Sequence, residues 1–145
     1  GIGVKANFAS MIQWVYRGIP LPFGRINNLR SFLALPNLCD FVAHVLEHPA
    51  AANQIFLVAD PRSLSTSQLL VEIAQALNVS PRLFYMPPML LRILGCCFGI
   101  GMKLQRLCSS LEMDTRKAQS LLQWRAPFSL SQTLSLMVSF HRERF

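Results

Sequence analysis

Few side chains in the sequence have the type and spacing that catalysis requires. His44 and His48 stand four residues apart, so one helix face could carry both imidazoles as a pair of metal ligands. Near the C-terminal end of a helix, however, a histidine more often faces solvent or caps the last carbonyl groups. The seven acidic residues are too few to indicate a general-acid pair. We predict no metal site and no catalytic residue in this chain.

Sequence motifs for cofactor binding and covalent catalysis are absent. No strand leads into Gly-x-Gly-x-x-Gly, and neither Gly-x-x-x-x-Gly-Lys nor Gly-x-Ser-x-Gly occurs. Neither Tyr16 nor Tyr85 is followed four residues later by the lysine that a tyrosine base would need. The chain by itself is therefore expected to bind no cofactor and to catalyse no redox reaction.

The charge of the chain suits an anionic partner. Lysine and arginine number 14 against seven acidic residues, so the net charge is +7 at pH 7. The basic residues are scattered, which favours single arginines in a phosphate site over a nucleic-acid-binding stripe. We expect a phosphate-bearing ligand and no nucleic acid.

The composition is unusually apolar for a domain of this size. The 145 residues suffice for one domain with a hydrophobic core, so we treat residues 1–145 as a single domain. Apolar residues make up 52% and charged residues only 14%, which excludes intrinsic disorder. The surplus suggests an apolar surface covered by something else; the alternative is a compact domain with a few exposed apolar patches. The start at Gly1 fits a loop entered midway, so we expect a fragment of a longer protein.

Cysteine usage indicates a reducing compartment. The four cysteines show no zinc-type spacing, and Cys96 and Cys97 are adjacent in an apolar stretch. We expect free, buried thiols in the cytoplasm.

The apolar stretch from Leu83 to Met102 approaches the length of a membrane span. Pro87-Pro88 and Arg92 interrupt it, and three glycines weaken the rest. This pattern favours a buried or interface helix that begins at the prolines over a membrane-spanning helix.

The elements that must position any ligand alternate between helices and short strands. Apolar residues recur at helical spacing from Val4 to Arg17, and Gly18 is a C-terminal stop. Four short strands are predicted: Ile19–Phe23 at an edge, Arg30–Leu35, the buried Gln54–Ala59, and Leu83–Met86. Together with about six helices they predict an α/β fold with few strands.

Cap residues define the starts of the remaining helices. Pro36-Asn37 opens a helix with Asn37 as N-cap, and His48-Pro49 ends it. Ser65 and Gln68 form a capping box, as do Ser129 and Gln132, and Asp114 caps another short helix.

Several short segments carry a resemblance when they are taken in order. They are Gly1–Phe8, Leu21–Gly24, Arg30–Phe32, Asn37–Asp40, Gln54–Val58 with Ser65-Thr66, and Asp114–Ala118 with Leu121–Trp124 and Phe128–Leu130. Each is weak alone, but the ordered set resembles the C-terminal part of the extended short-chain dehydrogenase/reductases. Within that group it resembles the NAD-dependent epimerases and dehydratases of nucleotide sugars.

The resemblance implies that the cofactor and the substrate are bound by different domains. In that family an N-terminal Rossmann domain holds NAD and supplies the tyrosine and lysine, while the smaller lobe holds the nucleoside diphosphate of the sugar. The chain would then be the substrate-binding lobe, without the Rossmann domain, of an enzyme that transiently oxidises a UDP-sugar at C4.

The resemblance also assigns candidate substrate-binding residues. Asn7 and Phe8 would lie along the nucleotide, and Leu21 and Phe23 would flank the uracil. Arg30 would reach the diphosphate, with Arg106 as a second candidate. Guanidinium groups pair bidentately with phosphate oxygens, which agrees with that role. The ordinary alternatives are a surface position for either arginine and a core position for either phenylalanine.

The sequence departs from the family pattern at three positions. Ser31 replaces the usual aspartate, and Pro36 stands where an acidic residue is preferred. Gln123 replaces the glycine before Trp124, which costs about 1 kcal/mol if that position needs a left-handed backbone. Two other functions stay open: a non-catalytic module of the same ancestry that senses a nucleotide or contacts a partner, and a peripheral membrane protein that docks through Leu83–Met102.

Overall fold

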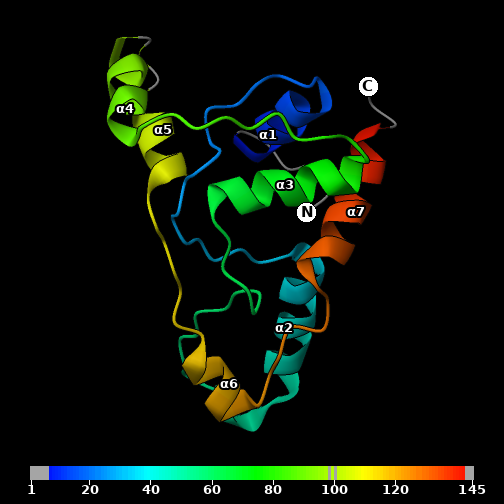
Figure 1. Ribbon diagram of the computed structural model, residues 1–145. Helices are drawn as coiled ribbons and strands as arrows, with labels where there is room; N and C mark the ends of the chain where they lie inside the picture. Colours follow the sequence, from blue (N-terminus) through cyan, green and yellow to red (C-terminus); the bar gives the residue numbers. More distant parts are fainter. Residues whose placement is uncertain (1–6, 98, 100, 143–145) are drawn as a thin grey trace. The chain divides into compact units, whose positions relative to one another are not determined.

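The computed structural model describes residues 7–97, 99 and 101–142, and these are mostly helical (Figure 1). Seven α-helices and one 3₁₀ helix lie in this part of the chain. They are α1 (Asn7–Tyr16), α2 (Leu35–Glu47), η1 (Pro49–Ala51), α3 (Thr66–Leu77), α4 (Pro88–Cys97), α5 (Gly101–Cys108), α6 (Arg116–Leu122) and α7 (Leu130–Arg142).

Strand pairing in the described residues is reduced to isolated bridges. Leu21 pairs with Leu83 in parallel, and Arg30 pairs with Leu64 and with Leu111. The prolines at positions 20 and 22 have no N–H to donate, so this segment cannot pair with a further strand on its opposite edge. The expected α/β character is therefore confirmed only as a mainly helical fold with few and very short strand pairings.

The prediction of a buried strand over Gln54–Ala59 is wrong. This segment has no strand partner in the described structure, and its side chains alternate between two environments. Ile55 and Leu57 are 84% and 52% exposed, whereas Phe56 and Val58 pack against the core beside α2 and α6. A run of apolar residues occurs both in extended segments that are buried on one face and in strands that are buried on both faces. The sequence alone therefore did not distinguish the two cases.

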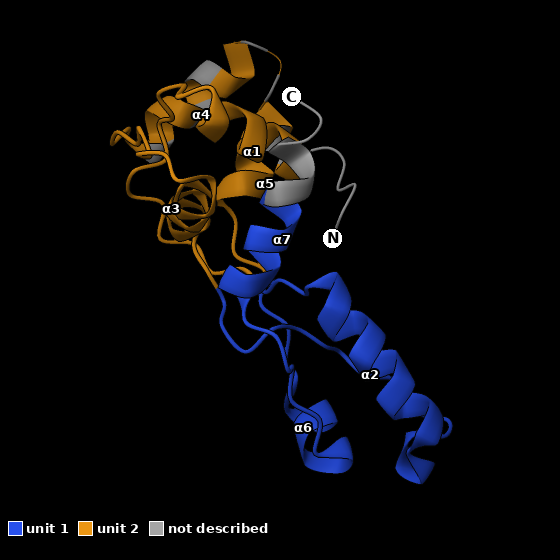
Figure 2. Ribbon diagram, turned by 90° about the vertical axis from the view of Figure 1, so that its right-hand side faces the viewer, with its two compact units in different colours: residues 1–3, 31–63, 112–145 blue, residues 4–30, 64–111 orange. Residues whose placement is uncertain are grey.

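The chain divides into two compact units, coloured separately in Figure 2. One contains residues 1–3, 31–63 and 112–145, and is called unit 1; the other contains residues 4–30 and 64–111, and is called unit 2. Each unit is built from segments that are distant in the sequence, so long-range contacts must assemble both.

Unit 2 is centred on the packing of α1 against α3. Both helices bury their apolar stripes, and burying a leucine or isoleucine side chain is worth about 1.5–3 kcal/mol. The fully or nearly fully buried apolar residues on the two helices are Met11, Ile12, Val15, Leu69, Leu70, Ile73, Ala74 and Leu77.

The ends of α1 and α3 confirm the cap residues read from the sequence. Gly18 has φ +64°, and the Ile19 N–H donates to the Trp14 carbonyl, which completes a Schellman motif after α1. At the start of α3 the Ser65 hydroxyl accepts the Gln68 N–H at 3.0 Å, while the Gln68 side chain accepts the Ser65 N–H at 2.9 Å.

Helices α4 and α5 pack against each other as a hairpin in unit 2 (Figure 1). Pro88 is the first residue of α4, as expected for a proline-started helix. The close approach depends on Gly95, where a Cβ atom would lie 2.6 Å from the Leu104 Cδ1 and 3.2 Å from the Gly101 Cα. Among the described helices none combines the length and the hydrophobicity that crossing a bilayer would need.

In unit 1 the core forms where α2, η1 and α6 meet, with Trp124 at its centre. The Trp124 ring stands edge-on to Phe41, with centroids 5.0 Å apart, and its Nε1–H donates to the Asp40 carboxylate at 2.8 Å. Ala51, Ala118 and Leu122 complete the buried cluster.

Helix α2 begins earlier than predicted, and Asn37 is not its N-cap. The helix starts at Leu35 after Ala34, whose N–H donates to both Asp60 carboxylate oxygens at 3.2 and 3.3 Å. The Asn37 side chain is instead fully buried and bonds Asp60 and the backbone of Phe128. A carboxylate from a distant loop thus serves the helix start, which local sequence could not reveal.

The two later caps were predicted with different success. Ser129 and Gln132 form the expected reciprocal bonds at the start of α7. Asp114 stands one residue too early to be the N-cap of α6, because Thr115 occupies that position.

The four thiols are free, but the expectation that they are buried is wrong for three of them. Cys39, Cys96 and Cys97 are exposed, and only Cys108 is half-buried, where desolvation raises the pKa of its thiol. The adjacent pair lies at the end of α4, whose outward face includes exposed apolar side chains such as Ile93.

Candidate functional site

The structure brings the two predicted diphosphate ligands, Arg30 and Arg106, together in unit 2. Arg30 exchanges backbone hydrogen bonds with Leu64, each at 3.0 Å, which holds its main chain in an extended conformation. Its side chain reaches the last turn of α5, where the Arg30 Nη1 donates to the carbonyl oxygen of Arg106. The sequence separation of these residues is 76, so their proximity is a tertiary property.

The two arginines have no acidic partner among the described residues. Arg106 is exposed and Arg30 is partly exposed, and neither guanidinium has a carboxylate partner within the described residues. The sequence contains no aspartate or glutamate from residue 73 to residue 111, a stretch that includes all of α4 and α5. Guanidinium groups without competing carboxylates are suited to phosphate oxygens, which they bind through paired, charge-assisted hydrogen bonds.

A buried asparagine lies beside the two arginines. Asn28 is 4% exposed, and its Nδ2 donates to the carbonyl oxygens of Leu107 and Ser109, both at 3.0 Å. Its Oδ1 accepts the Thr66 N–H at 2.8 Å. Asn28 was not singled out from the sequence, because its partners lie 38 to 81 residues away.

Leu21 and Phe23, predicted to flank a uracil, are buried in unit 2. They are 6% and 3% exposed, so little of either side chain is available to a ligand. Their backbone is held by long-range bonds: the Leu21 N–H donates to the Arg82 carbonyl at 2.8 Å, and the Phe23 carbonyl accepts the Ser67 hydroxyl. Contact of these residues with a base stays a prediction.

The other two predicted nucleotide contacts lie at the start of α1. Asn7 is the first residue of the helix, and its side chain lies outside the described part of the structure. Phe8 is half-buried. Their proposed contact with a nucleotide likewise stays a prediction.

The possible metal pair on α2 has other partners. The His44 Nε2 lies 2.9 Å from the Leu122 carbonyl at the end of α6, and the His48 Nδ1 accepts the Ala50 N–H. Asp40, one turn before His44, accepts the Trp124 N–H. No group of three or more metal-binding side chains occurs among the described residues.

Comparison with known proteins supports the resemblance carried by the motifs. The chain is 39% identical over 133 residues to UDP-glucose 4-epimerase from Vibrio cholerae, an alignment that covers 91% of this chain and 40% of that protein. No protein-family model matches the chain.

Two solved structures have a similar fold. UDP-N-acetylglucosamine 4-epimerase from Bacillus cereus gives a TM-score of 0.70 at 15% identity, with 98% of this chain and 43% of that one covered. UDP-glucose 4-epimerase from Thermotoga maritima, solved with UDP-glucose, gives 0.65 at 18% identity, with 98% and 41% covered. The chain is thus related to the NAD-dependent epimerase/dehydratase family, and it spans about two fifths of the length of these relatives.

Proposed function

We propose that this chain is the nucleotide-sugar-binding part of an NAD-dependent sugar epimerase or dehydratase, with a UDP-sugar as its ligand. The observation that carries the proposal is the contact of the Arg30 guanidinium with the Arg106 backbone carbonyl at the end of α5, with no carboxylate paired to either arginine within the described residues. The sequence relative is a UDP-glucose 4-epimerase, which supports the ligand class.

In this proposal the chain binds and orients the substrate, while the reaction is completed by another part of a longer protein. The described residues do not fit NAD, because they contain no parallel sheet with a strand that leads through a glycine-rich loop into a helix. NAD, which would accept and return the hydride at the sugar C4, is accordingly assigned to a Rossmann domain outside this chain. The arginines would hold the diphosphate and so fix the distance from the nucleotide to the sugar.

The direct test is titration of the chain with UDP, UMP and uridine by calorimetry, in parallel with Arg30→Ala and Arg106→Ala. UDP should bind more tightly than uridine, and each substitution should weaken UDP binding about tenfold or more, since a charge-assisted hydrogen bond is worth about 1.5–3 kcal/mol. Uridine binding should change little.

Arg125→Ala is the matched control, because it removes an equal charge from an exposed position in unit 1. If Arg30→Ala and Arg125→Ala bind UDP equally well, the assignment of the diphosphate to Arg30 is wrong. A non-catalytic nucleotide sensor would also bind UDP through these arginines. If the longer protein is such a sensor, it should not interconvert UDP-glucose and UDP-galactose in the presence of NAD.

A further inference from the structure

We infer that Asn28 is a positioning residue for the diphosphate site: its amide fastens the C-terminal end of α5 so that Arg106 stays beside Arg30. The inference rests on the proposed function. It concerns a residue with no expected ligand contact, since Asn28 is only 4% exposed.

Both the nitrogen and the oxygen of the Asn28 side-chain amide form hydrogen bonds to other segments of the chain. Both of its N–H groups are directed at carbonyl oxygens that follow Arg106, one on Leu107 and one on Ser109. Its oxygen accepts the first N–H of α3, from Thr66. Asn28 therefore joins three segments, which are its own extended segment, the end of α5 and the start of α3.

The neighbouring backbone continues the same connection. The Leu29 N–H donates to the Ser110 hydroxyl at 3.1 Å, and the Leu111 N–H donates to the Leu29 carbonyl at 2.8 Å. Because side chains two residues apart in an extended chain point the same way, Asn28 and Arg30 both face the end of α5. Arg30 reaches Arg106 from this shared side.

The capping of α5 also matters for the electrostatics of anion binding. The C-terminal end of a helix presents unpaired carbonyl groups with partial negative charge, which repel a phosphate. Here three carbonyls at the end of α5 receive side-chain donors: Arg106 from Arg30 and Ser109, Leu107 from Asn28 and Thr66, and Ser109 from Asn28. Removing the Asn28 amide would leave the Ser109 oxygen without its side-chain donor beside the proposed site, and the Leu107 oxygen with Thr66 alone.

The test compares Asn28→Ala with Asn37→Ala, a matched buried asparagine in unit 1. Asn37 is 0% exposed, and its amide also bonds through both its nitrogen and its oxygen. Both variants should lower the midpoint of thermal unfolding. Only Asn28→Ala should weaken UDP binding, by about tenfold, while uridine binding in that variant stays within about twofold of wild type.

The combination of Asn28→Ala with Arg106→Ala separates positioning from general loss of structure. If Asn28 acts through Arg106, the double variant should bind UDP no more weakly than Arg106→Ala alone. Equal weakening of UDP and uridine by Asn28→Ala would overturn the inference, and so would wild-type UDP binding in that variant.

A ligand-free measurement keeps the inference testable even if the proposed function fails. In NMR spectra of the chain without ligand, the Arg30 guanidinium signals should show slow rotation in wild type and in Asn37→Ala, and faster rotation in Asn28→Ala. Unchanged Arg30 signals in Asn28→Ala would refute the positioning role whatever the chain binds. If Asn28→Ala does not fold, Thr66→Val removes one donor to Leu107 and should produce a smaller change in the same direction.

Discussion

At the scale of single residues, Gln123 carries a conformational cost that its neighbours do not share. It follows α6 with φ +53° and ψ +20°, in the left-handed region. The other non-glycine residues with positive φ in the described structure are Asn53 and Asn78, and asparagine tolerates this region well. The departure from glycine noted in the sequence therefore falls on a position that does require left-handed backbone.

Replacing Gln123 with glycine should stabilise the protein by about 1 kcal/mol, because glycine adopts this conformation without the clash of a Cβ atom. Urea-induced unfolding would measure the gain. Asn78→Gly is the control at a second left-handed position, and it should change stability by no more than a few tenths of a kcal/mol. A Gln123→Gly variant that is less stable than wild type would show that the glutamine side chain contributes something the structure does not reveal.

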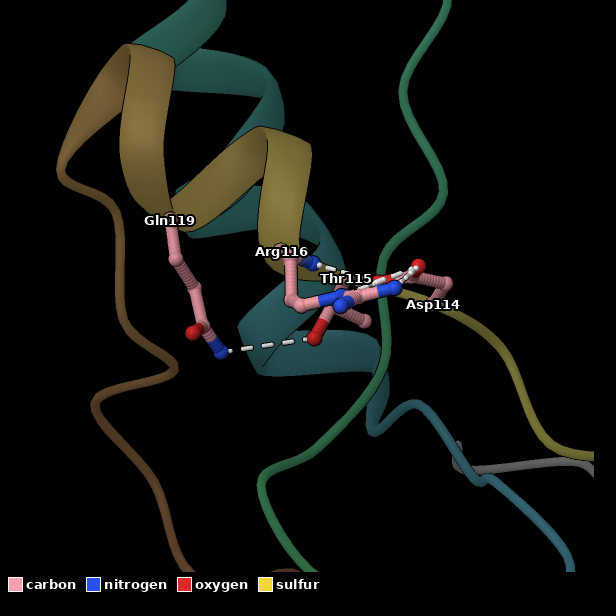
Figure 3. Close-up of polar contacts among 4 residues, drawn as sticks. All are labelled: Asp114, Thr115, Arg116 and Gln119. Carbon is pink, nitrogen blue, oxygen red and sulfur yellow. Dashed lines mark hydrogen bonds and ion pairs between the residues drawn. The ribbon is translucent and has the colours of Figure 1, made fainter.

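At the scale of elements, the start of α6 depends on a local ion pair rather than on a standard cap. The Asp114 carboxylate accepts the Arg116 N–H at 3.0 Å and pairs with the Arg116 guanidinium at 2.6 Å, as Figure 3 shows. Gln119 reaches back to the Thr115 hydroxyl at 3.3 Å. The side-chain hydrogen bond from Arg116 is the main reason that the pKa of Asp114 falls to about 2.

This lowered pKa predicts how the start of α6 responds to acid. The carboxylate stabilises the folded chain above its usual pKa of 3.8, and that contribution is lost as the pH falls through the folded-state pKa of about 2. Between these values the amide NMR signals at the start of α6 should shift in wild type and stay nearly constant in Asp114→Asn. Glu112→Gln, an exposed change two residues earlier, should retain the wild-type titration.

At the scale of the whole molecule, the net charge of +7 should strengthen the binding of an anionic ligand, in addition to the effect of the individual arginines. Positive potential attracts an anionic ligand, and salt weakens that attraction because the screening length falls from about 10 Å at 0.1 M to about 3 Å at 1 M. The net positive charge should therefore attract the proposed ligand before the ligand contacts Arg30.

The Kd for UDP should accordingly rise roughly three- to tenfold between 0.05 and 0.5 M NaCl, while the Kd for uridine stays nearly constant. Calorimetry at a series of salt concentrations would measure both. In the Arg30→Ala variant the salt dependence for UDP should be smaller. Equal salt dependence for UDP and uridine would contradict an electrostatic role for the diphosphate.

The sequence by itself determined most features that depend on contacts within a few residues. Helix periodicity, the stop at Gly18 and the capping boxes at Ser65 and Ser129 are local, because their hydrogen bonds link residues no more than five apart. The ordered motifs also identified the family, which the comparisons support. Arg30 was named from one of those motifs and Arg106 from the family resemblance outside them, although their roles as ligands stay predictions.

Only the tertiary structure decided which distant segments meet. It showed that Gln54–Ala59 covers the core with one face, that Asp60 serves the start of α2, and that Arg30 lies against Arg106. It also revealed Asn28, whose partners are far away in the chain. These outcomes depend on long-range packing and hydrogen bonding, and a residue's type and neighbours do not specify which remote carbonyl or carboxylate will be within reach.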